Sequence, residues 1–149
     1  MERAGAVPGL LWSVLESTNF IESVSDAERI RTAIEWQFDA DISNNETVAF
    51  LQRCIGLEAI LGDDEQSRAI PITEKLADRY AYLLGKTASE RKQLKDEFVL
   101  VYRKRSDLVH ARRSQLTAGD RVVVDGARTI LSKIIMNEVH WLVRRNRPS

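Results

Sequence analysis

The sequence is poor in the features that mark several classes of protein. Cys54 is the single cysteine, so the chain cannot form an internal disulfide, and we expect no cysteine-based zinc site. No apolar run approaches the roughly 18 residues of a membrane span, and the N-terminus lacks the pattern of a secretory signal. These absences favour a reducing compartment, and we expect a cytoplasmic protein without membrane contact.

Helix breakers and strand signals are also scarce. The three prolines, Pro8, Pro71 and Pro148, stand at predicted helix starts or near the chain ends. The β-branched run at 122–124 is continuous with a helical pattern of apolar residues. With 149 residues, of which 44% are hydrophobic, the chain can bury one core. We therefore predict one all-α domain over 1–149, an up-and-down bundle of five to six helices.

Capping residues and apolar periodicity place the helices. Ser25 is a suitable N-cap before a stripe of Ile30, Ile34 and Phe38. Thr87 and Glu90 have the spacing of a capping box, and they begin the longest charged helix. We expect six helices, over 9–20, from 25 past 38, from 44 or 45 to 62, over 71–84, from 87 to about 112, and over 120–145.

The formal net charge is +0, so nucleic-acid binding would depend on a local basic patch. Five basic side chains fall within eleven positions late in the chain, Arg103, Lys104, Arg105, Arg112 and Arg113. Another basic group lies near the C-terminus, Arg144, Arg145 and Arg147. Both groups are also compatible with solvated helix ends, where cations are favourable.

His110 is the stronger candidate of the two histidines. We interpret His140, in an apolar helical context beside Trp141, as structural. His110 follows the basic run, and arginine binds phosphate while histidine exchanges protons near neutral pH. This pair of residue types suits RNA cleavage in which the ribose 2′-hydroxyl attacks its own phosphate. The chemistry calls for no metal or cofactor, and we expect neither.

Helix geometry puts a condition on this site. At about 100° per residue, Arg105 and His110 lie roughly 140° apart, whereas Arg103, Ser106 and His110 share a face. Arg105 projects closer to the apolar stripe, and an arginine there needs a partner. That partner could be a carboxylate, a second subunit or a ligand.

Three segments carry a resemblance to a known family. Residues 51–62 (LQRCIGLEAILG), 78–85 (DRYAYLLG) and 102–110 (YRKRSDLVH) resemble the "ALE-x-L", "ERVAxLLG" and "YxxRSxxVHG" helices of ApeA-like HEPN domains. Arg105 and His110 match the Arg-x(4–6)-His motif of the HEPN superfamily. The similarity extends over about 30–145 in order and spacing.

The resemblance implies a helical bundle that dimerises and brings two Arg/His motifs into one cleft. Many HEPN domains are metal-independent ribonucleases of anti-phage, toxin–antitoxin and CRISPR systems. By carry-over, Arg105 and His110 would be catalytic, with Ser106 as a supporting polar residue. The RNA-binding residues would be Arg103, Lys104, Arg112 and Arg113. ApeA-like domains usually end a longer protein, so an additional domain or a regulatory partner also fits.

The sequence departs from the family pattern at two positions. Ala111 replaces the glycine that often follows the histidine, and Arg112 replaces the tyrosine of antitoxin-partnered toxins. Glu58 and Arg79 match the family text without an assigned role, and Arg79 could pair with a carboxylate to fix helix packing. A non-catalytic module that binds RNA, nucleotide or a partner protein is the alternative, and a purely structural assembly domain is a third hypothesis.

Overall fold

The structure, a computed structural model, describes residues 21–62, 71–110 and 115–145. These residues form helices and contain no strand, which confirms the predicted all-α bundle. The helix predicted over 9–20 lies outside the described residues. The elements are α2 (Ile21–Ile42), α3 (Glu46–Leu61), α4 (Ile72–Leu84), α5 (Ala88–Val109), the short 3-10 helix η1 (Ala118–Asp120) and α6 (Arg121–Arg145).

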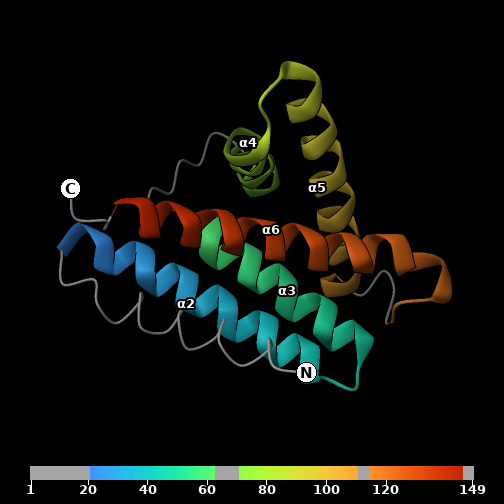
Figure 1. Ribbon diagram of the computed structural model, residues 1–149. Helices are drawn as coiled ribbons and strands as arrows, with labels where there is room; N and C mark the ends of the chain where they lie inside the picture. Colours follow the sequence, from blue (N-terminus) through green and yellow to red (C-terminus); the bar gives the residue numbers. More distant parts are fainter. Residues whose placement is uncertain (1–20, 63–70, 111–114, 146–149) are drawn as a thin grey trace, which may run out of the picture.

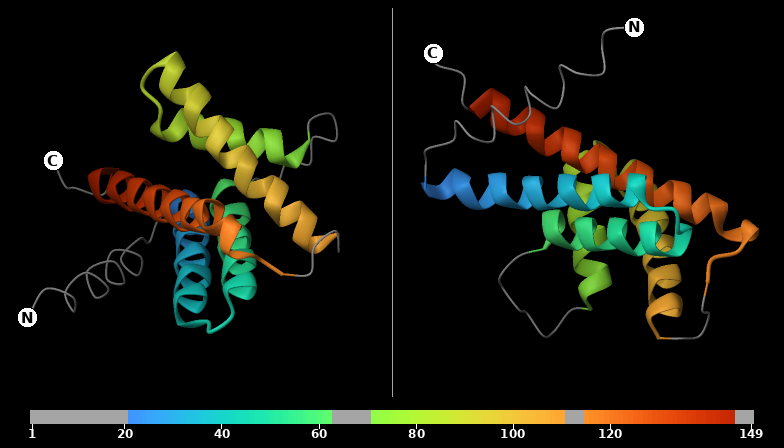
Figure 2. Two further views of the ribbon diagram at one scale, coloured as in Figure 1. Left: turned by 90° about the vertical axis from the view of Figure 1, so that its right-hand side faces the viewer. Right: turned by 90° about the horizontal axis from the view of Figure 1, so that it is seen from below.

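Three helices lie side by side, and a helical hairpin crosses them. α2 runs antiparallel to α3 and to α6, and the α4–α5 hairpin crosses α6 steeply on the opposite side from α2 (Figures 1 and 2). α3 and α6 each contact all four other described α-helices. α3 and α6 therefore form the centre of the bundle, with α2 on one side and α4–α5 on the other.

The core is built from the inner faces of these helices. Phe50 and Leu57 of α3 and Leu131 and Ile134 of α6 have no exposed surface. A row of aromatic rings continues the core under the hairpin. The rings of Tyr80 and Phe98 lie 5.7 Å apart, and those of Phe98 and Tyr102 stack at 4.7 Å. The aromatic row anchors α4 and α5 to the central helices.

Local signals set most helix ends. Asn45 accepts a hydrogen bond from the Val48 N–H at 3.1 Å, as expected of an N-cap. Thr87 and Glu90 form the predicted capping box of α5. Gly85 ends α4 in an extended conformation, and a side chain is disfavoured there because an added Cβ would lie 2.7 Å from the Ala81 carbonyl oxygen.

α2 differs from its prediction in two respects. Residues 21–25 are already helical, so Ser25 is not its N-cap, and Phe38 is 63% exposed instead of continuing the buried stripe. Small residues form the buried face instead, among them Ala33 and Ala40 beside Ile30. Alanines allow the α3 backbone to approach closely, and this packing decides which side of α2 is covered.

Arg79, for which the sequence allowed a carboxylate partner that fixes helix packing, contacts a backbone carbonyl group. Its Nη1 donates a hydrogen bond of 2.5 Å to the carbonyl oxygen of Leu61, the last residue of α3. A helix end leaves its final carbonyl groups without partners in the helix, and a cation is favourable there. The side chain thus links the end of α3 to α4.

Candidate functional site

The predicted site lies at the C-terminal end of α5. The helix continues to Val109, and His110 caps it, with the His110 N–H donating to the Ser106 carbonyl oxygen at 3.0 Å. The side chains of Arg103 and His110 are exposed, and that of Ser106 is half-buried. Since the helix is continuous, these three residues share one face, as the spacing predicts.

Arg105 is held by a carboxylate of the same chain. Its Nη2 lies 3.1 Å from Glu58 Oε1 of α3, and the two side chains are 32% and 35% exposed. Of the partners that the sequence allowed, the described residues therefore supply the carboxylate. An ion pair this exposed contributes about 0–1 kcal/mol to stability, so its main effect is to fix the guanidinium at the surface.

A buried hydroxyl completes this junction between α3 and α5. The Tyr102 hydroxyl donates to the Cys54 carbonyl oxygen at 3.4 Å. Burial raises the pKa of Tyr102, and the neighbouring charge of Glu58 raises it further. Burial also raises the pKa of Cys54 to about 12, so Cys54 is a core residue rather than a reactive thiol.

Lys104 has an internal partner as well. Its Nζ lies 2.5 Å from Asp120 Oδ1, with both side chains nearly buried at 13% and 10% exposed. This ion pair and a hydrogen bond from the Thr117 backbone lower the pKa of Asp120 to about 2. The pair joins α5 to the start of α6. A contact of Lys104 with RNA, which stays a prediction, would compete with this ion pair.

The remaining predicted site residues are placed in part. Arg103 is exposed and free to approach an anion from solvent. Arg112 and Arg113, the other two predicted RNA-binding residues, lie outside the described residues. The structure therefore brings together Glu58, Arg105 and Tyr102 at the α3–α5 junction, next to the turn of α5 that ends at His110.

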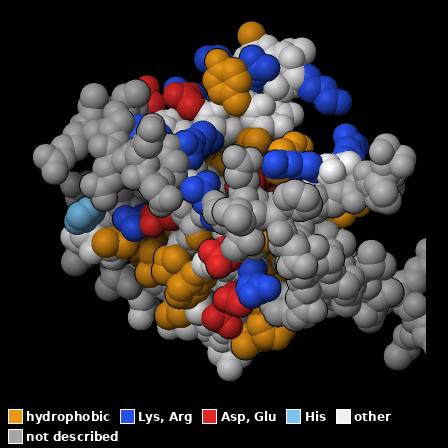
Figure 3. All heavy atoms as spheres, turned by 90° about the vertical axis from the view of Figure 1, so that its left-hand side faces the viewer, with side chains coloured by type: hydrophobic (Ala, Val, Ile, Leu, Met, Phe, Trp, Pro, Cys, Tyr) orange, Lys and Arg blue, Asp and Glu red, His pale blue; other side chains and the backbone are white. Residues whose placement is uncertain are grey.

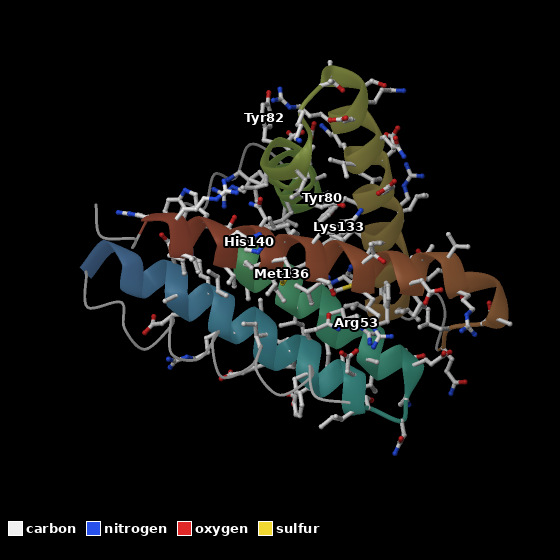
Figure 4. All side chains as sticks on the ribbon, viewed as in Figure 1. Arg53, Tyr80, Tyr82, Lys133, Met136 and His140 are labelled. Atoms are coloured by element: carbon white, nitrogen blue, oxygen red, sulfur yellow. The ribbon has the colours of Figure 1, made fainter. Side chains whose placement is uncertain are left out.

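His140 has a different environment from the one expected. The side chain is exposed, and it lines a groove of about 730 Å³ between α6 and the α4–α5 hairpin, together with Lys133 and Met136. Figure 4 shows these three residues on the side of α6 that faces the hairpin. The interpretation of His140 as a structural residue therefore gains no support from burial, since the side chain lies at the surface of α6.

A second polar cluster, centred on Arg53 of α3, was not predicted from the sequence. Arg53 is buried and pairs with Asp41 at 2.9 Å. A signal was available, since Arg53 falls in the same helical row as Phe50 and Leu57, which are core residues. A charge on the buried face of a helix indicates a partner or a ligand.

One face of the molecule carries charges of both signs among its described residues. On the face drawn in Figure 3, basic, acidic and hydrophobic side chains are interspersed. In the described segments, no three His, Cys, Asp or Glu side chains are grouped so that they could hold a metal ion. None of the described helices has the length and apolarity required to cross a bilayer.

Comparisons of the chain with family models, with curated proteins and with solved structures find no match.

Proposed function

We propose that the chain is a metal-independent endoribonuclease domain of a prokaryotic defence or stress system, anti-phage or toxin-like, that acts as a dimer. The observation that carries the proposal is the fixed but partly exposed guanidinium of Arg105 on the helix that ends in the exposed His110. A guanidinium that is held in place loses little conformational freedom when it binds a phosphate. The type of reaction, cleavage of RNA without a metal, is inferred from the resemblance to HEPN domains.

The proposed reaction needs one base and one acid. A neutral imidazole takes the proton of the ribose 2′-hydroxyl, whose oxygen attacks the adjacent phosphorus. A protonated imidazole gives its proton to the departing 5′-oxygen, which leaves a 2′,3′-cyclic phosphate and a 5′-hydroxyl. Each chain offers one histidine at this helix end, so a dimer would provide both forms. Arg105 would stabilise the charge that grows on the phosphate.

The test is cleavage of an end-labelled RNA of mixed sequence in the presence of EDTA. We expect the native chain to cut and to leave cyclic phosphate ends, and His110→Ala and Arg105→Ala to lose at least about a hundredfold in rate. His140→Ala is the matched control, an exposed histidine elsewhere on the surface, and it should retain activity. Circular dichroism establishes that each variant is folded.

Equal activity in the native chain and in His110→Ala would exclude this site. No activity in any folded protein would favour the second candidate function. Light scattering of the native chain tests the dimer separately, since the proposed site requires two copies of His110.

The second candidate is a non-catalytic module that binds RNA, nucleotide or a partner protein. It is favoured by the internal ion pairs of Lys104 and Arg105, which already satisfy two of the expected phosphate-binding cations. This module would bind RNA without cutting it, through the exposed Arg103. Fluorescence anisotropy with a labelled RNA should then show binding that weakens with salt and with Arg103→Gln.

A further inference from the structure

A second hollow, away from the end of α5, has a volume of about 470 Å³. It opens between the end of α2, the first half of α3 and the start of α6, and its volume lies in the range of small-molecule sites. Small apolar residues form part of the wall. The charged residues that line it are Asp41, Glu46, Arg53, Arg121, Asp125 and Arg128.

Arg53 is the innermost of these side chains. It projects from α3 (Figure 4), and its side chain is only 7% exposed. Its Nη2 donates to Asp41 Oδ1 at 2.9 Å, but its Nε is buried without a hydrogen-bond partner. A buried N–H of a charged group is unfavourable when it is left unpaired, and native proteins seldom leave one so. Arg53 also lines the hollow, so its guanidinium is a nearly buried positive group in the wall of this space.

The inner part of the hollow has more positive than negative charge. Arg128 Nη2 also donates to Asp41 Oδ1, at 2.7 Å, so one carboxylate faces two guanidinium groups. Burial acts to raise the pKa of Asp41, but its bonds to Arg53 and Gln37 and the charge of Arg128 hold it below the ordinary value. Asp41 thus stays charged and is shared between two cations.

The charges at the rim offset this excess only weakly. Arg121 and Asp125 lie 3.9 Å apart, and both side chains are largely exposed to solvent, which screens them. Glu46 is also exposed. Its helix, α3, and the longer α6 both begin beside the hollow, and the N-terminal end of a helix is favourable for an anion.

We propose that this hollow binds a phosphate group, either inorganic phosphate or a small phosphate monoester, with the guanidinium groups of Arg53 and Arg128 as the ligands of its oxygen atoms. A phosphate has enough acceptors for the guanidinium groups of Arg53 and Arg128 together. Arg128 is 57% exposed and can turn from Asp41 toward the phosphate. Free inorganic phosphate and the phosphate of a nucleotide share this chemistry. The site is independent of the proposed ribonuclease site on α5.

Isothermal titration calorimetry on the full chain tests the proposal with three probes: inorganic phosphate, adenosine 5′-monophosphate and adenosine. We expect one or both phosphates to bind and adenosine not to bind. Arg128→Gln should weaken binding about tenfold, the scale of one charge-assisted contact. Arg128 is the variant of choice because it is exposed, whereas replacing the buried Arg53 could unfold the protein.

Two further variants make the test specific. Asp41→Asn removes the charge that competes for both guanidinium groups, so binding should become about threefold tighter. Arg144→Gln is the matched control, since it changes an exposed arginine elsewhere on α6, and it should leave the affinity unchanged. Tighter binding of the nucleotide than of inorganic phosphate would identify a nucleotide site, and equal affinity would identify a phosphate site.

The proposal fails if neither phosphate binds at millimolar concentration. It also fails if Arg128→Gln and Arg144→Gln bind equally well.

Discussion

Glu58 is the residue that gives Arg105 a defined position. The carboxylate lies on α3 and the guanidinium on α5, so the contact fixes one helix end against the centre of the bundle. If Arg105 binds the reacting phosphate, Glu58→Gln should lower the cleavage rate about tenfold through loss of alignment. The free energy of unfolding should change by no more than about 1 kcal/mol, because the pair is partly exposed.

This prediction is checked by measuring kcat and KM beside urea unfolding. Glu74→Gln is the control, because Glu74 also faces a cation, Lys95 at 3.8 Å, but lies on α4. A merely structural role for Glu58 would show as lost stability with unchanged kcat.

The ion pair between Asp120 and Lys104 predicts how the stability of the fold depends on pH. Lys104 holds the pKa of Asp120 at about 2, below the ordinary value of 3.8. A carboxyl whose pKa is lowered by folding contributes stability above its unfolded pKa, and the contribution is lost as the pH falls through the folded value. The stability advantage of the native chain over Asp120→Asn should therefore be constant near neutral pH and disappear between about pH 4 and pH 2.

Urea unfolding of both proteins along a pH series measures this difference. Asp125→Asn serves as the control for removal of an exposed acid near the same helix start. A difference between the native chain and Asp120→Asn that is as large at pH 2 as at neutral pH would contradict the assignment of the ion pair.

At the scale of elements, the start of α5 is secured by its capping box. Thr87 Oγ1 accepts from the Glu90 N–H at 3.2 Å, and Glu90 Oε2 accepts from the Thr87 N–H at 3.2 Å. Thr87→Ala should lower the free energy of unfolding by about 1 kcal/mol. Ser89→Ala, an exposed change in the same turn, should be close to neutral in the same urea experiment. Equal effects of the two changes would show that the cap contributes little.

Helix ends were predictable because caps act between neighbouring positions. Asn45, Thr87 and Gly85 stand where the sequence places them, and α6 begins within a residue of its expected start. Buried faces were less predictable. Of the predicted stripe of α2, Ile30 is buried and Ile34 packs against the core, but Phe38 is exposed. The packing of α3 covers a neighbouring face of alanines in its place. That choice depends on a partner helix, which a local pattern does not encode.

At the scale of the whole molecule, Gly56 marks the place where α2, α3 and α6 meet. An added Cβ would lie 3.0 Å from Leu131 Cδ2 and 3.3 Å from Trp36 Cβ. The steric cost of about 1–3 kcal/mol should exceed the gain of about 1 kcal/mol in helix propensity. Gly56→Ala should therefore lower the free energy of unfolding by about 1 kcal/mol.

Gly126→Ala is the matched control because its nearest neighbour, Val101 Cγ2, would lie at an ordinary 3.7 Å. That change should raise stability by up to about 1 kcal/mol, since it brings only the gain in propensity. Chemical denaturation of both variants tests the pair, and a stabilising Gly56→Ala would show that the three helices can separate without cost.

The candidate site was predictable only in its outline. The spacing on one helix placed Arg103, Ser106 and His110 together and required a partner for Arg105. The identity of that partner, Glu58, depends on how α3 and α5 cross. The hollow around Arg53 depends still more on long-range contacts, since Asp41 and Arg128 are 87 positions apart in the chain. The C-terminal end of α2 and the start of α6 come together only in the folded bundle, so the sequence pattern does not reveal the hollow.

The central position of α6 also affects the order in which the core can form during synthesis of the chain. α6 covers α2 and α3, yet it begins at Arg121, about sixty residues after α3 ends at Leu61. At a synthesis rate of roughly 5–20 residues per second, the α2–α3 hairpin leaves the ribosome some 3–12 seconds before the helix that seals it begins to appear. During that interval the inner face of the hairpin is open to chaperones and to other nascent chains.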